Sequence, residues 1–323
     1  KNIFFICFCA LFAFSGCADD DDDLLTGGNV DIDLLPDAKP NDVVDPQVFE
    51  AINLNYPGLE KVKEFYEAGE HYYAANALLE YYRTRTNVTN PNLSLINVTI
   101  SEAEQAKADY ALVDYRFHVN NFYEDKETLK PYSVKQDGGI NWEYSPKDAS
   151  DEYQKQLHRH QWFIPQAKAY RVSGDEKYIQ SWIEVYKNWI ENNPKPTTGP
   201  NTTSWWQLQV STRIGDQVQL LEYFKNSVNF TPEWLSTFLV EFAEQADFLV
   251  DYPYESGGNI LISQANALAT AGTLMPEFKN AEKWMNTGYQ ILSEEVQNQI
   301  MSDGWHKEMS LHYHIGIVAD FYE

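Results

Sequence analysis

Apolar side chains recur at helical spacing in the stretch from Glu60 to Arg85, EKVKEFYEAGEHYYAANALLEYYRTR. They form two runs on either side of Gly69: Val62, Phe65 and Tyr66, then Tyr73, Ala77 and Tyr81. Residues three and four apart share one face of a helix, so each run predicts an amphipathic helix. A glycine between the runs favours a reversal of the chain, and we therefore predict two antiparallel helices packed as a hairpin.

The same period continues along most of the chain, whereas strand patterns are nearly absent. A capping box that begins at Ser101 marks one helix start. Thr231 followed by Pro232 marks another. We expect helices over residues 151–172, 177–192, 205–224, 231–250, 259–275, 279–300 and 307–323, with a loop-rich connector at 120–150. Consecutive hairpins without a repeat of fixed length predict an all-α fold, either an α/α solenoid or an (α/α) toroid, which we expect to be incomplete and truncated at its C-terminus.

The first 17 residues, KNIFFICFCALFAFSGC, combine a lysine, a short apolar run and a small-residue end. This pattern is typical of a signal peptide, and its Ser-Gly-Cys end resembles a bacterial lipobox in which Cys17 is lipidated. Residues 18–45 carry an acidic block and several prolines, which predict a solvated tether before a folded domain at 46–323. We expect an outer-membrane lipoprotein, on the cell surface or the periplasmic face, with membrane contact only through the lipid.

Composition excludes several classes of function. All three cysteines lie in the signal segment, so a disulfide, a thiolate zinc site or a catalytic thiol is excluded from the folded domain. The net charge of −24 excludes nucleic acid as a partner, because neutralising phosphates requires clustered lysine and arginine. An anionic ligand would have to be held by local groups, and the oligomeric state is left open.

The segment GWHKEMSLHYH, residues 304–314, is rich in titratable side chains. His312 and His314 are two residues apart and diverge on a helix, so the spacing does not predict a metal site. One interpretation is a helix start with Met309, Tyr313 and Ile317 packing inward. The other is an acid/base site, in which cationic neighbours help the Tyr313 phenol to lose its proton.

A second candidate segment, residues 255–272, begins with Glu-Ser-Gly-Gly-Asn. Asn259 follows two glycines at an expected helix start, where the usual role of asparagine is an N-cap. The alternative is a side-chain amide that donates hydrogen bonds to a ligand carboxylate. Asn266, seven residues later, would lie on the same helical face and could extend such a site.

A third group of candidates combines aromatic and cationic side chains from residues 152–178 and 204–221. Its members are His158, Arg159, His160, Trp162, Trp205, Trp206 and Arg213. Aromatic rings stack on sugar faces and arginine binds carboxylate or sulfate in a bidentate way, so the group suits an acidic polysaccharide. The alternative is helix packing, with Arg213 paired to Asp216 or Glu222.

These segments, in this order, carry a family resemblance. LHRHQWFIPQAKAYRVSGDEKY, WWQLQVSTR, GGNILISQANALATAGTLMPEFKNAEKW and above all DGWHKEMSLHYH resemble the amino-terminal toroid of the heparinase II/III-like polysaccharide lyases. Among them, the heparan-sulfate lyases of the heparinase III group, polysaccharide lyase family twelve, are most similar. The resemblance covers about residue 50 to the end, and it implies a carboxy-terminal β-sandwich that this chain does not include.

The resemblance also implies roles for individual residues. Asn259 would neutralise a uronate carboxylate, Tyr313 would be the catalytic tyrosine, and Glu308, in an E-x-S-x-x-Y-H pattern, would orient the site. His312 and His314 match as substrate contacts, whereas a further catalytic histidine would come from the sandwich. The implied reaction is β-elimination on heparan sulfate, giving a 4,5-unsaturated uronate. It requires no cofactor, and any structural divalent cation would belong to the part beyond this chain.

Three alternatives remain open at this stage. The first is a lyase of the same fold that acts on alginate or hyaluronan. The second is an α/α-barrel glycoside hydrolase that uses Asp303 and Glu308 as paired carboxylates. The third is a lipoprotein that binds a glycan without cleaving it.

Overall fold

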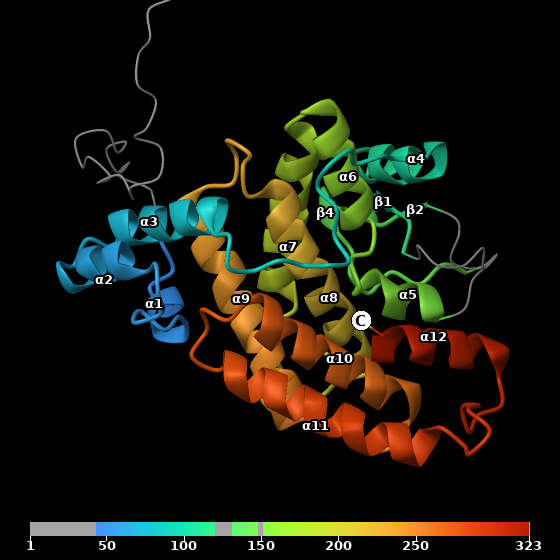
Figure 1. Ribbon diagram of the computed structural model, residues 1–323. Coiled ribbons are helices and arrows are strands. Elements are labelled where there is room, and N and C mark those ends of the chain that lie inside the picture. Colours follow the sequence, from blue (N-terminus) through green and yellow to red (C-terminus); the bar gives the residue numbers. More distant parts are fainter. Residues whose placement is uncertain (1–42, 120–130, 148–150, 323) are drawn as a thin grey trace, which may run out of the picture. The chain divides into compact units, whose positions relative to one another are not determined.

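The computed structural model describes residues 43–119, 131–147 and 151–322, and this part of the chain is mostly helical (Figure 1). Its helices are α1 (Gln47–Ala51), α2 (Glu60–Glu67), α3 (His71–Thr84), α4 (Glu102–Ala111), α5 (Glu152–Leu157), α6 (Phe163–Ser173), α7 (Lys177–Asn192), α8 (Gln207–Phe224), α9 (Pro232–Asp251), α10 (Gly258–Leu274), α11 (Ala281–Gln299) and α12 (Leu311–Tyr322). The prediction of an all-α fold is confirmed. None of these helices is long and apolar enough to span a membrane.

The described strands are two residues long, and all but the first lie in the connector expected at 120–150. β1 (Arg116–Phe117) pairs antiparallel with β2 (Tyr132–Ser133), and β3 (Lys135–Gln136) pairs antiparallel with β4 (Gly139–Ile140). The predicted signal peptide, Cys17, and all but the last three residues of the predicted tether lie outside the described residues.

Local signals placed several helix boundaries correctly. The chain reverses between α2 and α3, where Gly69 has φ +80°, and the two helices pack as the predicted hairpin. Ser101 accepts from the Glu104 backbone while the Glu104 side chain accepts from the Ser101 backbone, so the capping box is confirmed. Thr231 caps α9 by accepting from the Trp234 N–H at 3.3 Å.

The helix expected over residues 151–172 is wrong, because the chain breaks between α5 and α6. His160, between them, has φ +63°, a left-handed conformation that histidine adopts infrequently and that ends a helical run. The break brings the imidazole rings of His158 and His160 into the core, where they are 0% and 3% exposed. Burial of both rings among aromatic side chains therefore outweighs the local helical pattern.

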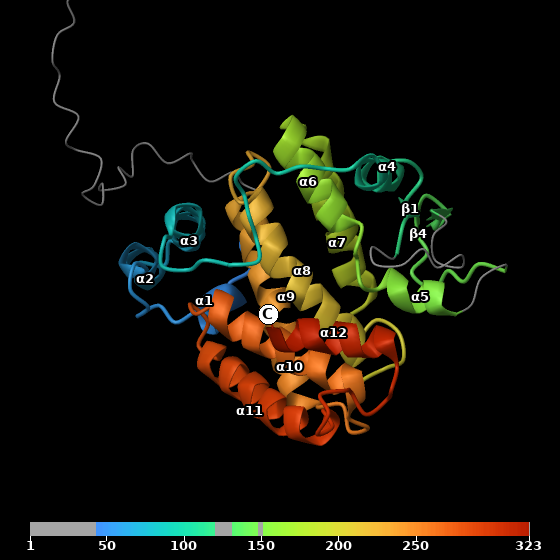
Figure 2. The same ribbon diagram turned by 45° about the vertical axis from the view of Figure 1, so that its right-hand side comes forward.

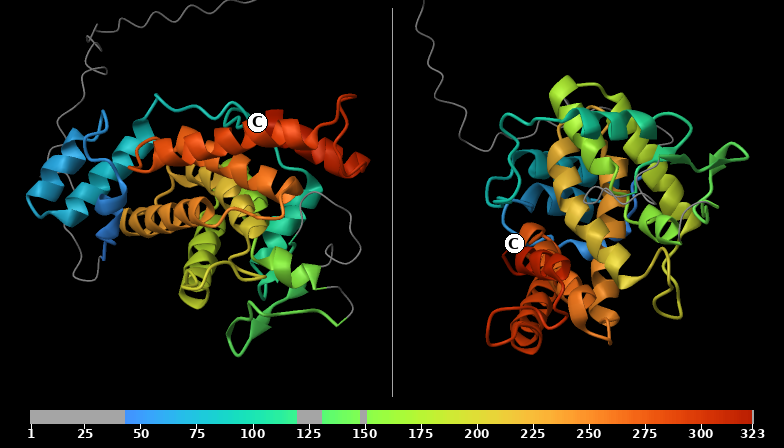
Figure 3. Two further views of the ribbon diagram at one scale, coloured as in Figure 1. Left: turned by 90° about the horizontal axis from the view of Figure 1, so that it is seen from below. Right: turned by 90° about the vertical axis from the view of Figure 1, so that its right-hand side faces the viewer.

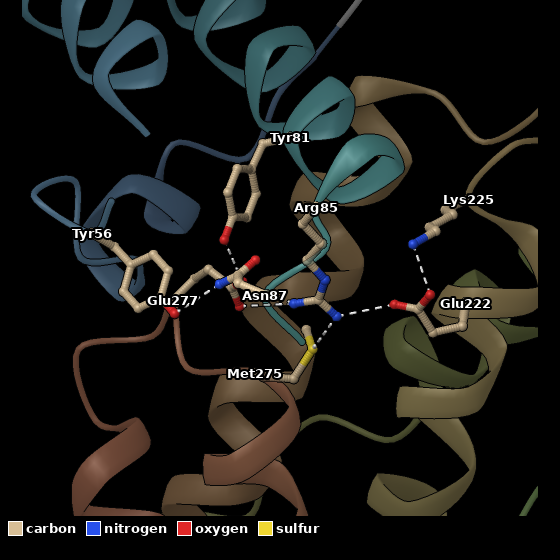
Figure 4. Close-up of polar contacts among 8 residues, drawn as sticks. All are labelled: Tyr56, Tyr81, Arg85, Asn87, Glu222, Lys225, Met275 and Glu277. Atoms are coloured by element: carbon tan, nitrogen blue, oxygen red, sulfur yellow. Dashed lines mark hydrogen bonds and ion pairs between the residues drawn. The ribbon is translucent and has the colours of Figure 1, made fainter. Parts of the chain in front are cut away.

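The hairpin α2–α3 is joined to later helices by Arg85, which directly follows α3 (Figure 4). Arg85 Nη1 donates to both carboxylate oxygens of Glu277, at 2.9 and 3.0 Å, and Nη2 donates to Glu222 at 3.0 Å. Tyr81 adds a 2.8 Å hydrogen bond to Glu277. Together with the packing of α1 and α3 on α9, these contacts join the first hairpin to the end of α10 (Figure 3).

Helices α10, α11 and α12 lie side by side in Figures 1 and 2 and contain the residues of greatest chemical interest. The contact between α10 and α11 is close because glycines face backbone atoms. A Cβ on Gly272 would lie 2.2 Å from the Ala281 oxygen, and one on Gly288 would lie 2.4 Å from the Ala265 oxygen. Only glycine fits at these two positions, so they fix how α11 lies on α10.

Candidate active site

Asn259 lies in the first turn of α10, after two glycines with positive φ. The cap position belongs to Gly257, with φ +65°, and Gly258 follows with φ +73°. Interpreting Asn259 as the N-cap is therefore wrong. Among the described residues, the half-buried Asn259 side chain has no hydrogen-bond partner, and its amide is free to donate to a ligand.

Tyr313 lies in the first turn of α12 with its side chain partly in solvent. It is 42% exposed, and Met309, expected on the same inward stripe, is 77% exposed. Only Ile317 of that predicted stripe is buried, at 1%. Interpreting Tyr313 as a core aromatic is therefore wrong, and its phenol is accessible to solvent and ligand.

The segment before α12 is not helical, contrary to the predicted start at Lys307. Gly304 and Met309 have φ +88° and +52°, and the helix begins only at Leu311. The resulting loop brings a Glu308 carboxylate oxygen 3.3 Å from where a Cβ on Gly258 would lie. Glu308 therefore lies against the first turn of α10, next to Asn259.

Contacts between α10 and α12 show that both helices run in the same direction. Glu308, in the loop just before α12, lies against Gly258 at the start of α10. Further along, the Ser263 hydroxyl donates to the Asp320 carboxylate at 2.9 Å, and the Asn266 amide donates to the Asp320 backbone oxygen at 2.8 Å. The chain therefore brings the starts of α10 and α12, with Asn259 and Tyr313, to one end of the helix pair.

Asn266 was predicted to extend the ligand site, and the structure gives it a different role. It is 9% exposed, its Nδ2 donates to α12, and its Oδ1 accepts from Thr270 at 3.0 Å. Because both ends of the amide are occupied, this expectation is corrected: Asn266 joins α10 to α12.

The two histidines beside Tyr313 have different surroundings. His312 is exposed, and its ring centroid lies 5.6 Å from that of Tyr313. His314 is half-buried, its ring lies 4.7 Å from the ring of Trp305, and its Nδ1 is buried without a partner among the described residues. His312 is thus the imidazole whose ring contact with the phenol the structure shows.

His306 is a buried residue that the sequence-based list of candidates missed. Its side chain is 0% exposed, and its Nε2 lies 2.8 Å from Gln299 Oε1. Burial lowers the pKa of His306 below its usual value, and the nearby Glu308 carboxylate partly opposes that change. The available signal was the short turn around Gly304, which pairs His306 with Ile300 in an isolated β-bridge.

Five members of the predicted sugar-binding wall are in the core, which corrects that expectation. They offer no surface on which a sugar could stack, since each is between 0% and 3% exposed: His158, His160, Trp162, Trp205 and Arg213. The Arg213 guanidinium donates to Gln245 at 2.8 Å and to the backbone oxygens of His158 and Ser204 at 2.7 and 2.8 Å. It also lies 4.3 Å from the centroid of the Trp189 ring. The packing interpretation therefore holds, although neither Asp216 nor Glu222 is the partner found for Arg213.

Burial shifts the titration of this core group. It lowers the pKa of His158 to about 3 and that of Arg213 to about 10, since both charged forms lose their water. His158 Nδ1 accepts from the Trp189 indole at 3.1 Å. The other two wall residues, Arg159 and Trp206, are half-buried, and Arg159 donates to Gln209 at 3.0 Å. A substrate contact by these two stays a prediction.

Two hollows in the described residues lie away from Asn259 and Tyr313. One is lined by α2 and the turn before it, including Tyr56, and the other lies beside Arg85 and Leu274. The described residues contain no group of three or more His, Cys, Asp or Glu arranged to hold a metal ion. The candidate site is the end of the α10–α12 pair at which an amide, a carboxylate and a phenol lie: Asn259, Glu308 and Tyr313.

Comparison with known proteins identifies the family. The family described as Heparinase II/III N-terminus matches residues 48–323. The chain belongs to the heparinase II/III family. A heparin-sulfate lyase of Bacteroides stercoris is 40% identical over 293 residues, and one of Pedobacter heparinus is 35% identical over 281 residues. These alignments cover 85% and 84% of this chain, but the chain spans only 42% and 41% of the lengths of the two lyases.

Solved structures of the heparinase II/III family show the same fold. A heparinase III matches with a TM-score of 0.75 at 37% identity, over 87% of this chain and 44% of that chain. A heparan sulfate lyase from Pedobacter heparinus matches with a TM-score of 0.72 at 33% identity, over 85% and 43% of the two chains. The helical hairpins are thus those of the family's amino-terminal toroid, as predicted.

Proposed function

We propose that the protein containing this chain cleaves heparan sulfate, or a related uronate-containing glycosaminoglycan, by β-elimination. The observation that carries the proposal is that a free Asn259 amide and an accessible Tyr313 phenol lie at the same end of the α10–α12 pair. Relatives that the chain matches are named heparin-sulfate lyases, which supports the substrate class.

The chemistry of a uronate explains why an amide and a phenol suffice. The proton on C5 is adjacent to a carboxylate, and its removal builds a second negative charge on that group. Hydrogen bonds from the Asn259 amide strengthen as this charge grows, and groups of this kind contribute roughly 10²- to 10³-fold to a rate. The C5 electron pair then forms the C4–C5 double bond as the C4–O bond breaks, leaving a 4,5-unsaturated uronate.

Tyr313 is suited to the two proton transfers. As phenolate it takes the C5 proton, and as phenol it returns a proton to the leaving glycosidic oxygen, so the tyrosine ends as it began. His312 is the imidazole next to this phenol, with the two ring centroids 5.6 Å apart. Because the amide neutralises the carboxylate, the reaction needs no metal or cofactor.

The test is to incubate the complete gene product with heparan sulfate and follow the absorbance of the unsaturated uronate. Tyr313→Phe should abolish nearly all product formation. Tyr322→Phe, a change on the same helix at an 87% exposed tyrosine, is the matched control and should retain wild-type activity. Equal rates for Tyr313→Phe and wild type would remove Tyr313 from the mechanism.

The same assay separates the remaining alternatives. Faster cleavage of alginate or hyaluronan than of heparan sulfate would change the substrate. Chain cleavage without an unsaturated product would indicate a hydrolase using Asp303 and Glu308. Asp303 accepts a 3.0 Å hydrogen bond from the Trp305 N–H, a contact that stabilises the turn. Binding without cleavage would indicate a glycan-binding protein.

We further propose that the protein is an outer-membrane lipoprotein anchored through Cys17. Support comes from the Ser-Gly-Cys end of the apolar leader and from the acidic block that follows it. Metabolic labelling with a fatty acid should mark the wild-type protein and not Cys17→Ser. Equal labelling of both proteins would contradict the anchor.

A further inference from the structure

Gln299, the last residue of α11, contacts both segments that carry the candidate catalytic groups. Its side chain is 0% exposed. Its Nε2 donates to the Gly258 backbone oxygen at 3.1 Å and also to Glu295, while its backbone oxygen accepts from the Lys307 N–H at 2.8 Å. One residue therefore connects the first turn of α10 with the loop that leads to α12.

The side-chain contacts of Gln299 determine the tautomer of His306. Since Gln299 Nε2 donates both its hydrogens, Oε1 must accept from His306, and His306 Nε2 carries the proton. His306 Nδ1 is then an acceptor, and the Glu308 N–H donates to it at 3.4 Å. The chain of contacts thus runs from Gly258 through Gln299 and His306 to the backbone of Glu308.

We propose that Gln299 and His306 are positioning residues, which set the separation between Asn259 and the Glu308–Tyr313 segment. The inference rests on the proposed lyase function. Gly258 immediately precedes Asn259, and Glu308 lies against Gly258, so a shift in either segment changes the geometry around the sugar. A misplacement of about 1 Å costs roughly 10²-fold in rate. Neither residue reaches the substrate, since both side chains are 0% exposed.

Gln299→Met tests this role, because methionine has a similar volume and lacks the amide. In the complete gene product, kcat should fall about 10- to 100-fold while KM stays within about twofold. Gln290→Met is the control on the same helix, where the amide contacts only an exposed Glu294, and it should behave as wild type. An unchanged kcat in Gln299→Met would overturn the proposal.

A pair of substitutions at His306 separates positioning from general stability. His306→Gln can still donate to Gln299 Oε1 and should keep kcat within a few fold of wild type. His306→Leu removes the donor and should resemble Gln299→Met. If both variants lose activity in proportion to a fall in thermal midpoint, the role is structural and the proposal fails.

Amide hydrogen exchange gives a readout that needs no turnover. Gln299→Met should increase exchange at Lys307 and Glu308, whereas exchange within α8 should not change. If wild type forms no unsaturated product but exchange at Lys307 and Glu308 still increases in Gln299→Met, the lyase function fails. The connection that Gln299 makes between the two segments then stands. If wild type is active and exchange at 307–308 is unchanged, the positioning inference alone is overturned.

Discussion

Arg85 and Glu277 are 192 residues apart in sequence and form an ion pair inside the protein, in which Arg85 Nη1 donates to both carboxylate oxygens. Their side chains are 2% and 0% exposed, and Tyr81 completes the hydrogen bonding of the carboxylate. This pair holds α3 against the turn between α10 and α11. Without Arg85, the buried Glu277 carboxylate would have no cationic partner.

Removal of one partner of the Arg85–Glu277 pair should therefore destabilise the folded protein. Arg85→Met leaves Glu277 buried with only Tyr81 as a donor, and we expect the free energy of unfolding to fall by about 3–5 kcal/mol. The double change Arg85→Met with Glu277→Met should recover part of that loss. Lys135→Met breaks the exposed pair with Asp114 and should cost less than about 1 kcal/mol. Urea unfolding of the four proteins would measure this, and equal costs for both pairs would contradict it.

His158 should make stability depend on pH. Its pKa is about 3 in the folded protein against 6.5 for a free imidazole, so between these values the unfolded chain binds the extra proton. The stabilising contribution is complete above pH 6.5 and declines as the pH falls, by up to about 1.4 kcal/mol per unit. His158→Asn can still accept from Trp189 without titrating, so unfolding curves for this variant should lose less stability than wild type between pH 6.5 and 5.

A matched exposed position controls for the other titrating groups. His71→Asn, on the surface of α3, should follow the wild-type pH dependence. Parallel curves for wild type and His158→Asn would show that the His158 pKa is not displaced as stated.

Two glycine substitutions should have opposite effects. Gly288→Ala places a Cβ 2.4 Å from the Ala265 oxygen, so α11 must move, and overpacking of this kind costs typically about 1–3 kcal/mol. Gly215→Ala, in α8, meets no atom within 4 Å and should stabilise the protein by up to about 1 kcal/mol through helix propensity. Thermal unfolding would compare them, and a stabilising Gly288→Ala would contradict the close contact.

Asn259→Ala should separate catalysis from folding. The amide has no hydrogen-bond partner among the described residues, so the thermal midpoint should stay close to that of wild type. If the amide neutralises the uronate carboxylate, kcat/KM on heparan sulfate should fall about 10²- to 10³-fold. Asn259→Asp should be at least as impaired, because it places a negative charge against the substrate. Full activity in either variant would assign the carboxylate contact to another residue.

The sequence predicted those parts of the fold that depend on neighbours in the chain. The Ser101 and Thr231 caps, the Gly69 reversal and the ends of α7 follow from side chains within a few residues of one another. The break at His160 was not predictable in this way. It depends on rings from distant segments, such as Trp142 and Trp189, whose centroids lie 5.7 and 4.9 Å from the His160 ring.

The candidate site was likewise only partly predictable from the sequence. Asn259 and Tyr313 were identified from the sequence through a family resemblance, and the structure shows why neither is a cap or a core residue. Gln299 gave no signal in the sequence, because its importance comes from contacts with Gly258 and with the loop after Gly304. The position of Glu308 could not be predicted from the sequence either, because it depends on the non-helical conformation of Met309.

Trp305 gives the protein an optical reporter beside its candidate site. All nine tryptophans lie among the described residues, and Trp305 is the one that is exposed, at 42%. Its emission should therefore be the most red-shifted component of the spectrum and the one most accessible to a soluble quencher such as iodide. Since its ring lies 4.7 Å from that of His314, binding of a polysaccharide at this end of the α10–α12 pair should change its fluorescence before any bond is broken.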